Sequence, residues 1–259
     1  MTKIVGVLNY NANSFSDGGK YNHLQDAKHR VDELFIEGAD VVDIGVCATS
    51  YGAPLISESE ELKRLKPLLK EIPPKNISID SYHYATMKYA VDKGVTYIND
   101  VTGGKDPKVL ELVAANPNLN YICMNSIVLP ADKKVRVESI DEIYDWVGKK
   151  IEECEKFGIQ KDRLIIDPGL GFSTDSNQSI GILRNIRHLK EFGVKICIGH
   201  SRKSFFEAIP DYEIYDRDID TLTASLYLLF YEVDYVRIHN VKMHKRSFII
   251  FSNLLNKID

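Results

Sequence analysis

The chain has 259 residues, of which 44% are apolar and 27% are charged, and its formal net charge is −4. This length and composition fit one large soluble domain, and the nearly balanced charge gives no general attraction to nucleic acid or to an anionic membrane surface. No apolar run approaches the roughly 20 residues of a membrane-spanning helix, and the first apolar run is too short for a secretory signal. We expect no nucleic-acid or membrane partner, so an anionic ligand has to be bound by a local cluster of groups.

The cysteines of the chain are far apart and form no C-x-x-C pair: Cys47, Cys123, Cys154 and Cys197. This spacing indicates neither a zinc knuckle nor a disulfide framework. We therefore predict a protein of the reducing cytoplasm.

Eight short runs rich in valine and isoleucine recur along the chain. In chain order they read KIVGVL, DVVDIG, NISID, VTYIND, NYICM, RLIID, VKICIG and VDYVRIH. Amphipathic stretches with helical spacing lie between them, for example Leu24, Ala27, Val31 and Leu34. Runs that are apolar throughout indicate strands buried on both faces of a parallel sheet. We predict an α/β fold that closes into one (β/α)8 barrel domain, residues 1–259, with an open doubly wound sheet as the alternative.

Local signals mark where the helices begin and end. Asp106 followed by Pro107 predicts a helix start, and Ser57 and Ser139 each precede a glutamate at the spacing of a capping box. Pro67 is expected to bend or split the second helix. Glycines predict helix ends at Gly38, Gly94, Gly158 and Gly193.

Hydrogen-bonding residues follow each apolar run: Asn9, Asp43, Asp80, Asn99 with Asp100, Asn125, Asp167, Ser201 to Ser204, and Arg237 with His239. In a barrel these strand ends converge on one mouth, where active sites are built. The sequence therefore predicts one polar site assembled from many separate segments.

Asp80 and Asp167 are carboxylates at the ends of buried strands, where a charge is costly unless it is paired. Lys203 is expected to supply a positive charge to Asp80 and Asp167, unless a ligand does so. A carboxylate beside Asn99 suits a flat heterocycle that presents several N–H donors. Phe172, in the loop DPGLGF, is available to stack on such a ring.

Arg237 and His239 stand two residues apart in a strand and so point to the same face. With Asn9 they predict a site for an anion or for a metal with its bound anion. The stretch NYNANSFSDGG after the first run, rich in small polar residues, suits a loop that closes over this site.

The ordered set of motifs resembles the dihydropteroate synthase family, the pterin-binding enzymes of folate biosynthesis. The motifs are GVLN, SFSDGG, DIG, SID, IND with VTGG, DPGLGF, SRKSF and VRIHNV. The resemblance implies a (β/α)8 TIM barrel, a homodimer and the use of Mg²⁺. It also implies a transferase that joins 4-aminobenzoate to (7,8-dihydropterin-6-yl)methyl diphosphate with release of pyrophosphate.

The same resemblance implies roles for individual residues. Asp80, Asn99, Asp167 and Lys203 correspond to the pterin pocket, Arg237 and His239 to the diphosphate site, and Ser204 to the arylamine side. Lys203, Arg237 and His239, with Asp17 of the mobile loop, are the implied catalytic residues, and Asn9 is the implied magnesium ligand. The implied substrate-binding positions are Thr49, Asp80, Asn99, Met124, Asp167, Phe172, Lys203, Ser204, Arg237 and His239.

The chain departs from the family pattern mainly in loops. Asn13 stands at an acidic position, and the second loop carries Cys47, Ser50 and Tyr51 where the family has glutamate, arginine and proline. Asn125 and Asn240 replace a histidine and an aspartate. We predict retained pterin recognition, changed handling of the second substrate and a weakened response to sulfonamides.

Three alternatives remain open: a pterin-binding paralogue without synthase activity, a folate-dependent methyltransferase, which the diphosphate motifs disfavour, and a Schiff-base enzyme with Lys203 as nucleophile. Asp43 and Asp100 are left out of the core site, because capping a helix or bracing a loop is expected at least as much as contact with the ligand. His200 and His244 are expected to lie on the surface or in loops. Cys47 is expected to be a loop residue without a nucleophilic role. An exposed apolar face that would support a dimer is predicted at Phe248, Ile249, Ile250 and Phe251.

Overall fold

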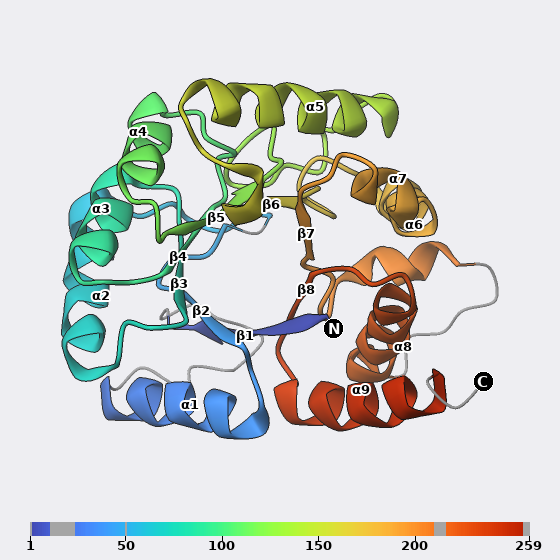
Figure 1. Ribbon diagram of the computed structural model, residues 1–259, viewed down its shortest axis with the longest axis horizontal. Coiled ribbons are helices and arrows are strands. Elements are labelled where there is room, and N and C mark those ends of the chain that lie inside the picture. Colours follow the sequence, from blue (N-terminus) through green and yellow to red (C-terminus); the bar gives the residue numbers. More distant parts are fainter. Residues whose placement is uncertain (1, 11–23, 50, 210–215, 256–259) are drawn as a thin grey trace.

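The computed structural model describes residues 2–10, 24–49, 51–209 and 216–255. Within them, eight parallel strands pair in chain order and close into a barrel, in which β1 pairs with both β2 and β8 (Figure 1). This confirms the (β/α)8 prediction over the open sheet. The strands are β1 Lys3–Asn9, β2 Val41–Gly45, β3 Ile77–Ser81, β4 Tyr97–Asp100, β5 Asn120–Met124, β6 Leu164–Asp167, β7 Lys195–Ile198 and β8 Tyr235–Ile238.

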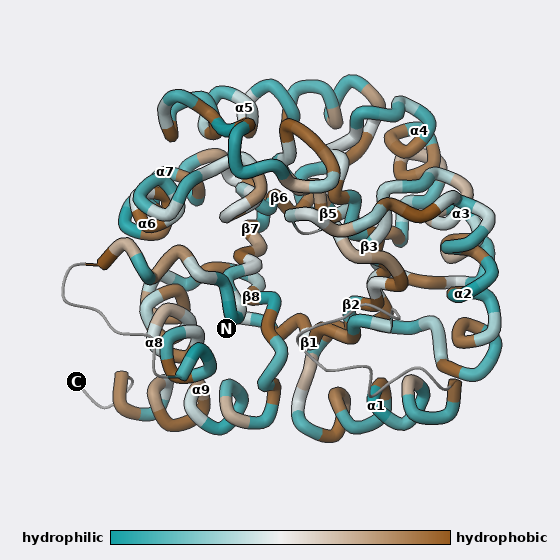
Figure 2. The backbone as a smooth tube through the Cα atoms, turned by 180° about the vertical axis from the view of Figure 1, so that it is seen from behind, coloured by the Kyte–Doolittle hydropathy of each residue, from teal (hydrophilic) through white to brown (hydrophobic). Residues whose placement is uncertain are grey.

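Helices form an outer ring around the sheet (Figure 1). The tube in Figure 2 is apolar along much of the strands, whereas the helices alternate between polar and apolar residues. No helix in the described ranges is both long and apolar enough to cross a membrane. The helices are α1 Leu24–Glu37, α2 Glu58–Glu71, α3 Tyr84–Asp92, α4 Pro107–Ala115, α5 Asp141–Lys156, η1 Lys161–Arg163, α6 Ser176–Arg184, α7 Ile186–Lys190, η2 Ser204–Ala208, α8 Arg217–Phe230 and α9 Val241–Leu255.

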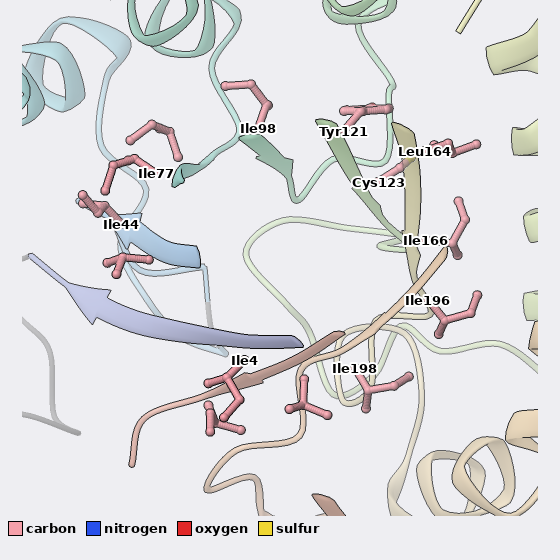
Figure 3. Packing of buried hydrophobic residues seen from close by; sticks show 14 of the residues in the cluster. Ile4, Ile44, Ile77, Ile98, Tyr121, Cys123, Leu164, Ile166, Ile196 and Ile198 are labelled. Carbon is pink, nitrogen blue, oxygen red and sulfur yellow. The ribbon is translucent and has the colours of Figure 1, made fainter. Parts of the chain in front are cut away.

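Each strand buries both of its faces, and the two faces belong to different clusters of buried residues. One set of alternate residues packs outward beneath the helices; Figure 3 shows Ile4, Ile44, Ile98 and Ile196 among them. The other set fills the barrel interior with a separate apolar cluster of Val5, Val41, Tyr97, Ile122, Ile165, Cys197 and Tyr235. Because side chains alternate along a strand, the inward positions two residues further on form the next layer. That layer is polar, with Asp43, Asn99, Asp167 and Arg237.

The helix boundaries follow the local signals. Asp106 caps α4 by accepting a hydrogen bond from the Lys108 amide at 3.0 Å, and all four glycines predicted to end helices have positive φ. Ser57 caps α2 by accepting a bond from the Glu60 amide, whereas α5 has Ile140 at its N-cap without a side-chain cap, and there the Ser139 amide donates to Glu142 Oε1 at 3.2 Å. Pro67 lies inside α2, which runs unbroken from Glu58 to Glu71, so the predicted split of this helix does not occur.

The apolar face predicted on the last helix is only half correct. Phe248 is 3% exposed and belongs to the core, and Phe251 is half-buried against it. Ile249 and Ile250 are exposed as predicted. Exposed apolar side chains on the neighbouring α8 and at the end of α9, which the sequence did not single out, are Tyr227, Phe230, Leu254 and Leu255.

Candidate active site

A cavity of about 730 Å³ opens at the C-terminal ends of the strands. Asn99 and Asp167 are buried in the barrel beside it, paired in register with Asp80 and Met124 of its wall. Asp17 lies outside the described residues. The predicted site residues that line the cavity are Asn9, Thr49, Asp80, Met124, Phe172, Lys203, Ser204, Arg237 and His239.

Arg237 is at the centre of the buried charges. Its Nε donates to Asp43 Oδ2 at 2.6 Å, and its Nη2 donates to Asp80 Oδ2. Asp43 Oδ2 also accepts a hydrogen bond from Asn99 Nδ2 at 3.0 Å. Asp43, which was left out of the predicted core site, is therefore hydrogen-bonded within it, whereas Asp100 braces its loop by accepting from the Gly104 amide at 2.8 Å.

The carboxyl groups and cations of this layer shift each other's pKa values. Burial, reinforced by Asp43, raises the pKa of Asp80 although Arg237 opposes the shift. Burial also raises the pKa of Asp167, against the effect of Lys203. Lys203 thus pairs electrostatically with Asp167, and the positive charge beside Asp80 comes from Arg237, which differs from the predicted pairing of Lys203 with both.

Two buried oxygen atoms of this layer have no hydrogen-bond partner among the described residues. They are Asp43 Oδ1 and Asn99 Oδ1, on side chains that are at most 2% exposed. An unpaired buried acceptor is costly, so the barrel interior is suited to a ligand that brings N–H donors. This agrees with the predicted flat heterocycle.

The part of the site at the ends of β1 and β8 is suited to an anion. His239 Nδ1 lies 2.8 Å from Ser201 Oγ, and His239 Nε2 lies 3.4 Å from Asn9 Nδ2. Burial, followed by Arg202 and Arg237, lowers the pKa of His239 to about 3, so the imidazole is neutral near pH 7. Ser201, which holds the ring, was visible in the sequence only as the first residue of SRKS.

The loop after β6 approaches the site closely because it contains glycine at position 169. A Cβ atom there would lie 2.0 Å from the carbonyl oxygen of Asn125, and φ is +73°. The Gly169 amide donates to Asp167 Oδ1 at 2.8 Å, which orients this carboxyl group. Phe172 of the same loop has Lys203 Nζ 5.1 Å from its ring centroid, and Nζ also donates to the carbonyl of Leu170 at 2.5 Å.

Two histidines that were expected at the surface or in loops are buried. His200 is fully buried between β7 and α8, with Nε2 2.8 Å from Ser225 Oγ, and burial lowers its pKa to about 4. His244 is 1% exposed and hydrogen-bonds through Nδ1 to the Asn240 carbonyl at 2.8 Å. His200 does lie in a loop, directly after β7, whereas His244 lies within α9, and its polar neighbours in KMHKR gave no sign that it is buried.

Cys47 is not a nucleophile in this structure. Its Sγ donates to Glu61 Oε1 at 3.2 Å, and burial raises the pKa of the thiol well above its usual range. Thiolate is the reactive form of cysteine, so a thiol with a raised pKa is inert near pH 7. All four cysteines are free and buried.

The closed parallel barrel, its mouth cavity and the polar layer at its strand ends are typical of a (β/α)8 barrel enzyme, here with groups that suit a flat, N–H-rich ring beside an anion. A family model described as pterin binding enzyme matches residues 5–239. The chain belongs to this family of pterin-binding enzymes.

Known members give the same assignment. A dihydropteroate synthase from Clostridium beijerinckii is 31% identical, over 95% of this chain and 91% of the relative. A folate synthesis bifunctional protein from Chlamydia caviae is 33% identical, and the match covers 95% of this chain but 58% of that longer protein. The crystal structure of dihydropteroate synthase from Anaplasma phagocytophilum with bound 6-hydroxymethylpterin-monophosphate superposes with a TM-score of 0.86 at 34% identity, covering 98% of this chain and 99% of the other.

Proposed function

We propose that the chain is a dihydropteroate synthase that joins 4-aminobenzoate to (7,8-dihydropterin-6-yl)methyl diphosphate and releases pyrophosphate. The observation that carries this proposal is the pair of unpartnered buried acceptors, Asp43 Oδ1 and Asn99 Oδ1, directly beneath a cavity that is lined by Arg237 and His239. The first feature requires N–H donors and the second suits an anion. A pterin with a diphosphate on its methyl group carries both, and membership of the family supports this transferase activity.

The pterin ring has its place between β3, β4 and β6. Asp80, Asn99 and Asp167 point into the barrel there and accept hydrogen bonds from the ring edge, while Lys203 faces Asp167 and Phe172. Met124 lines the same wall and contributes apolar contact. The negative charge of the carboxylates favours the electron-poor character that the ring acquires as the diphosphate departs.

The diphosphate lies at the β1 and β8 side. Arg237 and His239 line that part of the cavity and stabilise the leaving group as its charge develops.

The residues also suit Mg²⁺ as a cofactor. The amide oxygen of Asn9, beside His239, is the hard type of ligand that this cation prefers. No group of three or more His, Cys, Asp or Glu side chains that could hold a metal occurs in the described ranges, and in this proposal the diphosphate and water complete the coordination of the ion. When bound, the ion would neutralise charge on the departing diphosphate.

The reaction needs no protein nucleophile. The bond between the methylene carbon and the diphosphate oxygen breaks, and its electron pair leaves with pyrophosphate. The amine nitrogen of 4-aminobenzoate gives its lone pair to the carbon and then loses a proton to solvent. Thr49, Phe172 and Ser204 border the cavity where the arylamine must approach, and they orient it.

Three further features belong to the proposal: a homodimer, a cytoplasmic location and a weakened response to sulfonamides. The free buried cysteines support a reducing compartment. Exposed apolar side chains on α8 and α9 support association with a second copy. The changed residues Cys47 and Tyr51 at the mouth support altered sulfonamide binding.

Pyrophosphate release tests the proposal. The purified protein is incubated with the pterin diphosphate and magnesium, with and without 4-aminobenzoate, and the expected result is release that depends on the arylamine. Binding of the pterin diphosphate in calorimetry without any release would contradict the synthase assignment and support the non-catalytic paralogue. Absence of pterin binding would overturn the site itself.

A further inference from the structure

Two loops meet across the rim of the mouth cavity, the one after β2 and the one after β5. The Ala131 amide donates to the Thr49 carbonyl at 3.1 Å, which joins them. Beside this contact, Lys133 Nζ lies 5.2 Å from the centroid of the Tyr51 ring, and both side chains line the cavity. A cation and an aromatic ring therefore stand together at the rim.

A braced turn presents Lys133 in this position. Asp132 Oδ1 accepts a hydrogen bond from the Lys134 amide at 2.9 Å, and the Asp132 carbonyl accepts one from the Val135 amide at 3.0 Å. Arg136 Nη2 donates to the carbonyl of Lys133 at 2.6 Å. The backbone of Lys133 is thus held from both sides while its side chain extends along Tyr51.

The arginines of the outer cavity are each paired with a carboxylate. Arg136 pairs with Asp175 at 3.3 Å, Arg202 with Asp218 at 2.7 Å, and Arg217 with Glu207 at 3.3 Å. Within the described part of the chain, Lys133 Nζ has no carboxylate oxygen within 4.0 Å, the limit for an ion pair. Its charge is available to an anionic group that enters the cavity.

Lys133 lies at the outer rim of the cavity, on the side of the loop after β2. The Ala131–Thr49 contact carries the loop after β5 across the mouth to that side, and Lys133 and Tyr51 line the cavity together. Arg237 and the buried acceptors lie deeper, in the polar layer at the strand ends. A group bound by Lys133 is therefore the part of a ligand that points outward.

We propose that Lys133, held against Tyr51, binds the carboxylate of the arylamine substrate. This inference rests on the proposed synthase function, in which the amine of 4-aminobenzoate points inward to the methylene carbon. The carboxylate, at the other end of the ring, then faces the rim. The loop after β5 thus selects an anionic arylamine.

Lys133→Ala tests the proposal, with Lys134→Ala as the matched control. Lys134 is the exposed neighbour with the same charge, and it does not line the cavity. In Lys133→Ala the KM for 4-aminobenzoate is expected to rise about five-fold, the factor typical of an exposed ionic contact. The KM for the pterin diphosphate and kcat stay unchanged, and Lys134→Ala behaves as the unmodified protein.

A neutral arylamine isolates the contribution of charge. With 4-aminobenzamide, the KM of Lys133→Ala should equal that of the unmodified protein. An equal rise for the neutral and the anionic arylamine would overturn the proposal, as would equal KM values for 4-aminobenzoate in the two variants.

The failure of this inference is distinguishable from the failure of the proposed function. If the unmodified protein releases no pyrophosphate, the synthase assignment fails, and the inference is tested by calorimetry of 4-aminobenzoate binding to protein saturated with a pterin, pyrophosphate and magnesium. Weaker binding by Lys133→Ala than by Lys134→Ala supports it. Equal binding, or no binding to the unmodified protein, overturns it.

Discussion

Arg237 holds together the buried charges of the mouth, because it contacts Asp43 and Asp80 from a single guanidinium group. Burial alone would lower the pKa of Arg237, but the two carboxylates raise it, so it stays charged. A buried pair of this kind contributes little compared with an apolar pair, yet it is costly to break by removing one partner. Asp43 should therefore matter for folding as well as for the ligand.

The variant Asp43→Asn tests this point. The amide keeps the shape of the side chain but removes the charge that faces Arg237 Nε, and the free energy of unfolding is expected to fall by about 3 kcal/mol. Urea unfolding measures the change. Asp145→Asn, at an exposed position of α5, is the control and should leave stability unaltered. Equal stability of the two variants would show that the Asp43 charge is dispensable.

Lys203 should make the reaction sensitive to alkaline pH. Burial lowers its pKa to about 8, although Asp167 opposes the shift. The side chain is therefore charged below about pH 8 and neutral above it, and the proposed role in the pterin pocket needs the charged form. We expect kcat/KM for the pterin diphosphate, which reports the free enzyme, to fall as the pH rises through about 8.

The variant Lys203→Arg provides the comparison, because a guanidinium group stays charged throughout this range. Its kcat/KM is expected to be lower at neutral pH but to lose the alkaline decline. A decline at the same pH in both proteins would assign the titration to another group.

The sequence predicted the strands and helices more completely than it predicted the orientation of single side chains. Apolar runs and amphipathic spacing were sufficient to predict all eight strands and the closed sheet. They could not show which residues point inward, because strands buried on both faces carry no alternation of polarity. Asp43 and Asp100 therefore looked equivalent, although Asp43 points into the barrel and Asp100 braces a loop.

The residues of the candidate site could be predicted where a polar residue directly follows an apolar run. They could not be predicted where a contact forms between loops that are far apart in the sequence. Asp80, Asn99, Asp167 and Arg237 follow apolar runs, so their polarity stood out. Ser201, a small residue in a polar loop, gave no such signal, and its contact with His239 depends on how two neighbouring strands are paired.

The junction of α4 with β5 depends on one side chain from the segment before β6. Arg163 of η1 is 8% exposed, and its Nη1 donates to the carbonyls of Val113, Asn116 and Leu119 at 2.8, 3.2 and 3.3 Å. Arg163→Met keeps most of the apolar length but leaves these acceptors unpaired. The free energy of unfolding is expected to fall by about 2 kcal/mol, measured in urea.

Activity should be unaffected by this change, since Arg163 precedes β6 at the end of the barrel that stabilises the fold, away from the mouth. Arg184→Met, at the exposed end of α6, is the control and should change neither property. A loss of kcat/KM in folded Arg163→Met would show that the two ends of the barrel are coupled.

For the molecule as a whole, the apolar layer Val5, Val41, Tyr97, Ile122, Ile165, Cys197 and Tyr235 closes the barrel beneath the polar layer. This apolar layer contains no charged side chain, and the charged groups that a ligand can contact lie in the layer above it. The surface also carries one region of exposed apolar residues, on α8 and α9. These two helices pack side by side in both views of the chain (Figures 1 and 2).

The proposed homodimer predicts that this surface is covered by a second copy. Phe230 of α8 and Ile250 of α9 are each 52% exposed, and covering such side chains removes apolar surface from water. Sedimentation velocity should show a dimer, and Ile250→Glu should raise its dissociation constant about ten-fold or more, because a carboxylate would lose water at the interface. Ile36→Glu on α1, where the isoleucine is 86% exposed, is the control and should leave the dimer intact. A monomeric protein would contradict the proposed dimer, and equal dimerisation of the two variants would place the interface on other elements.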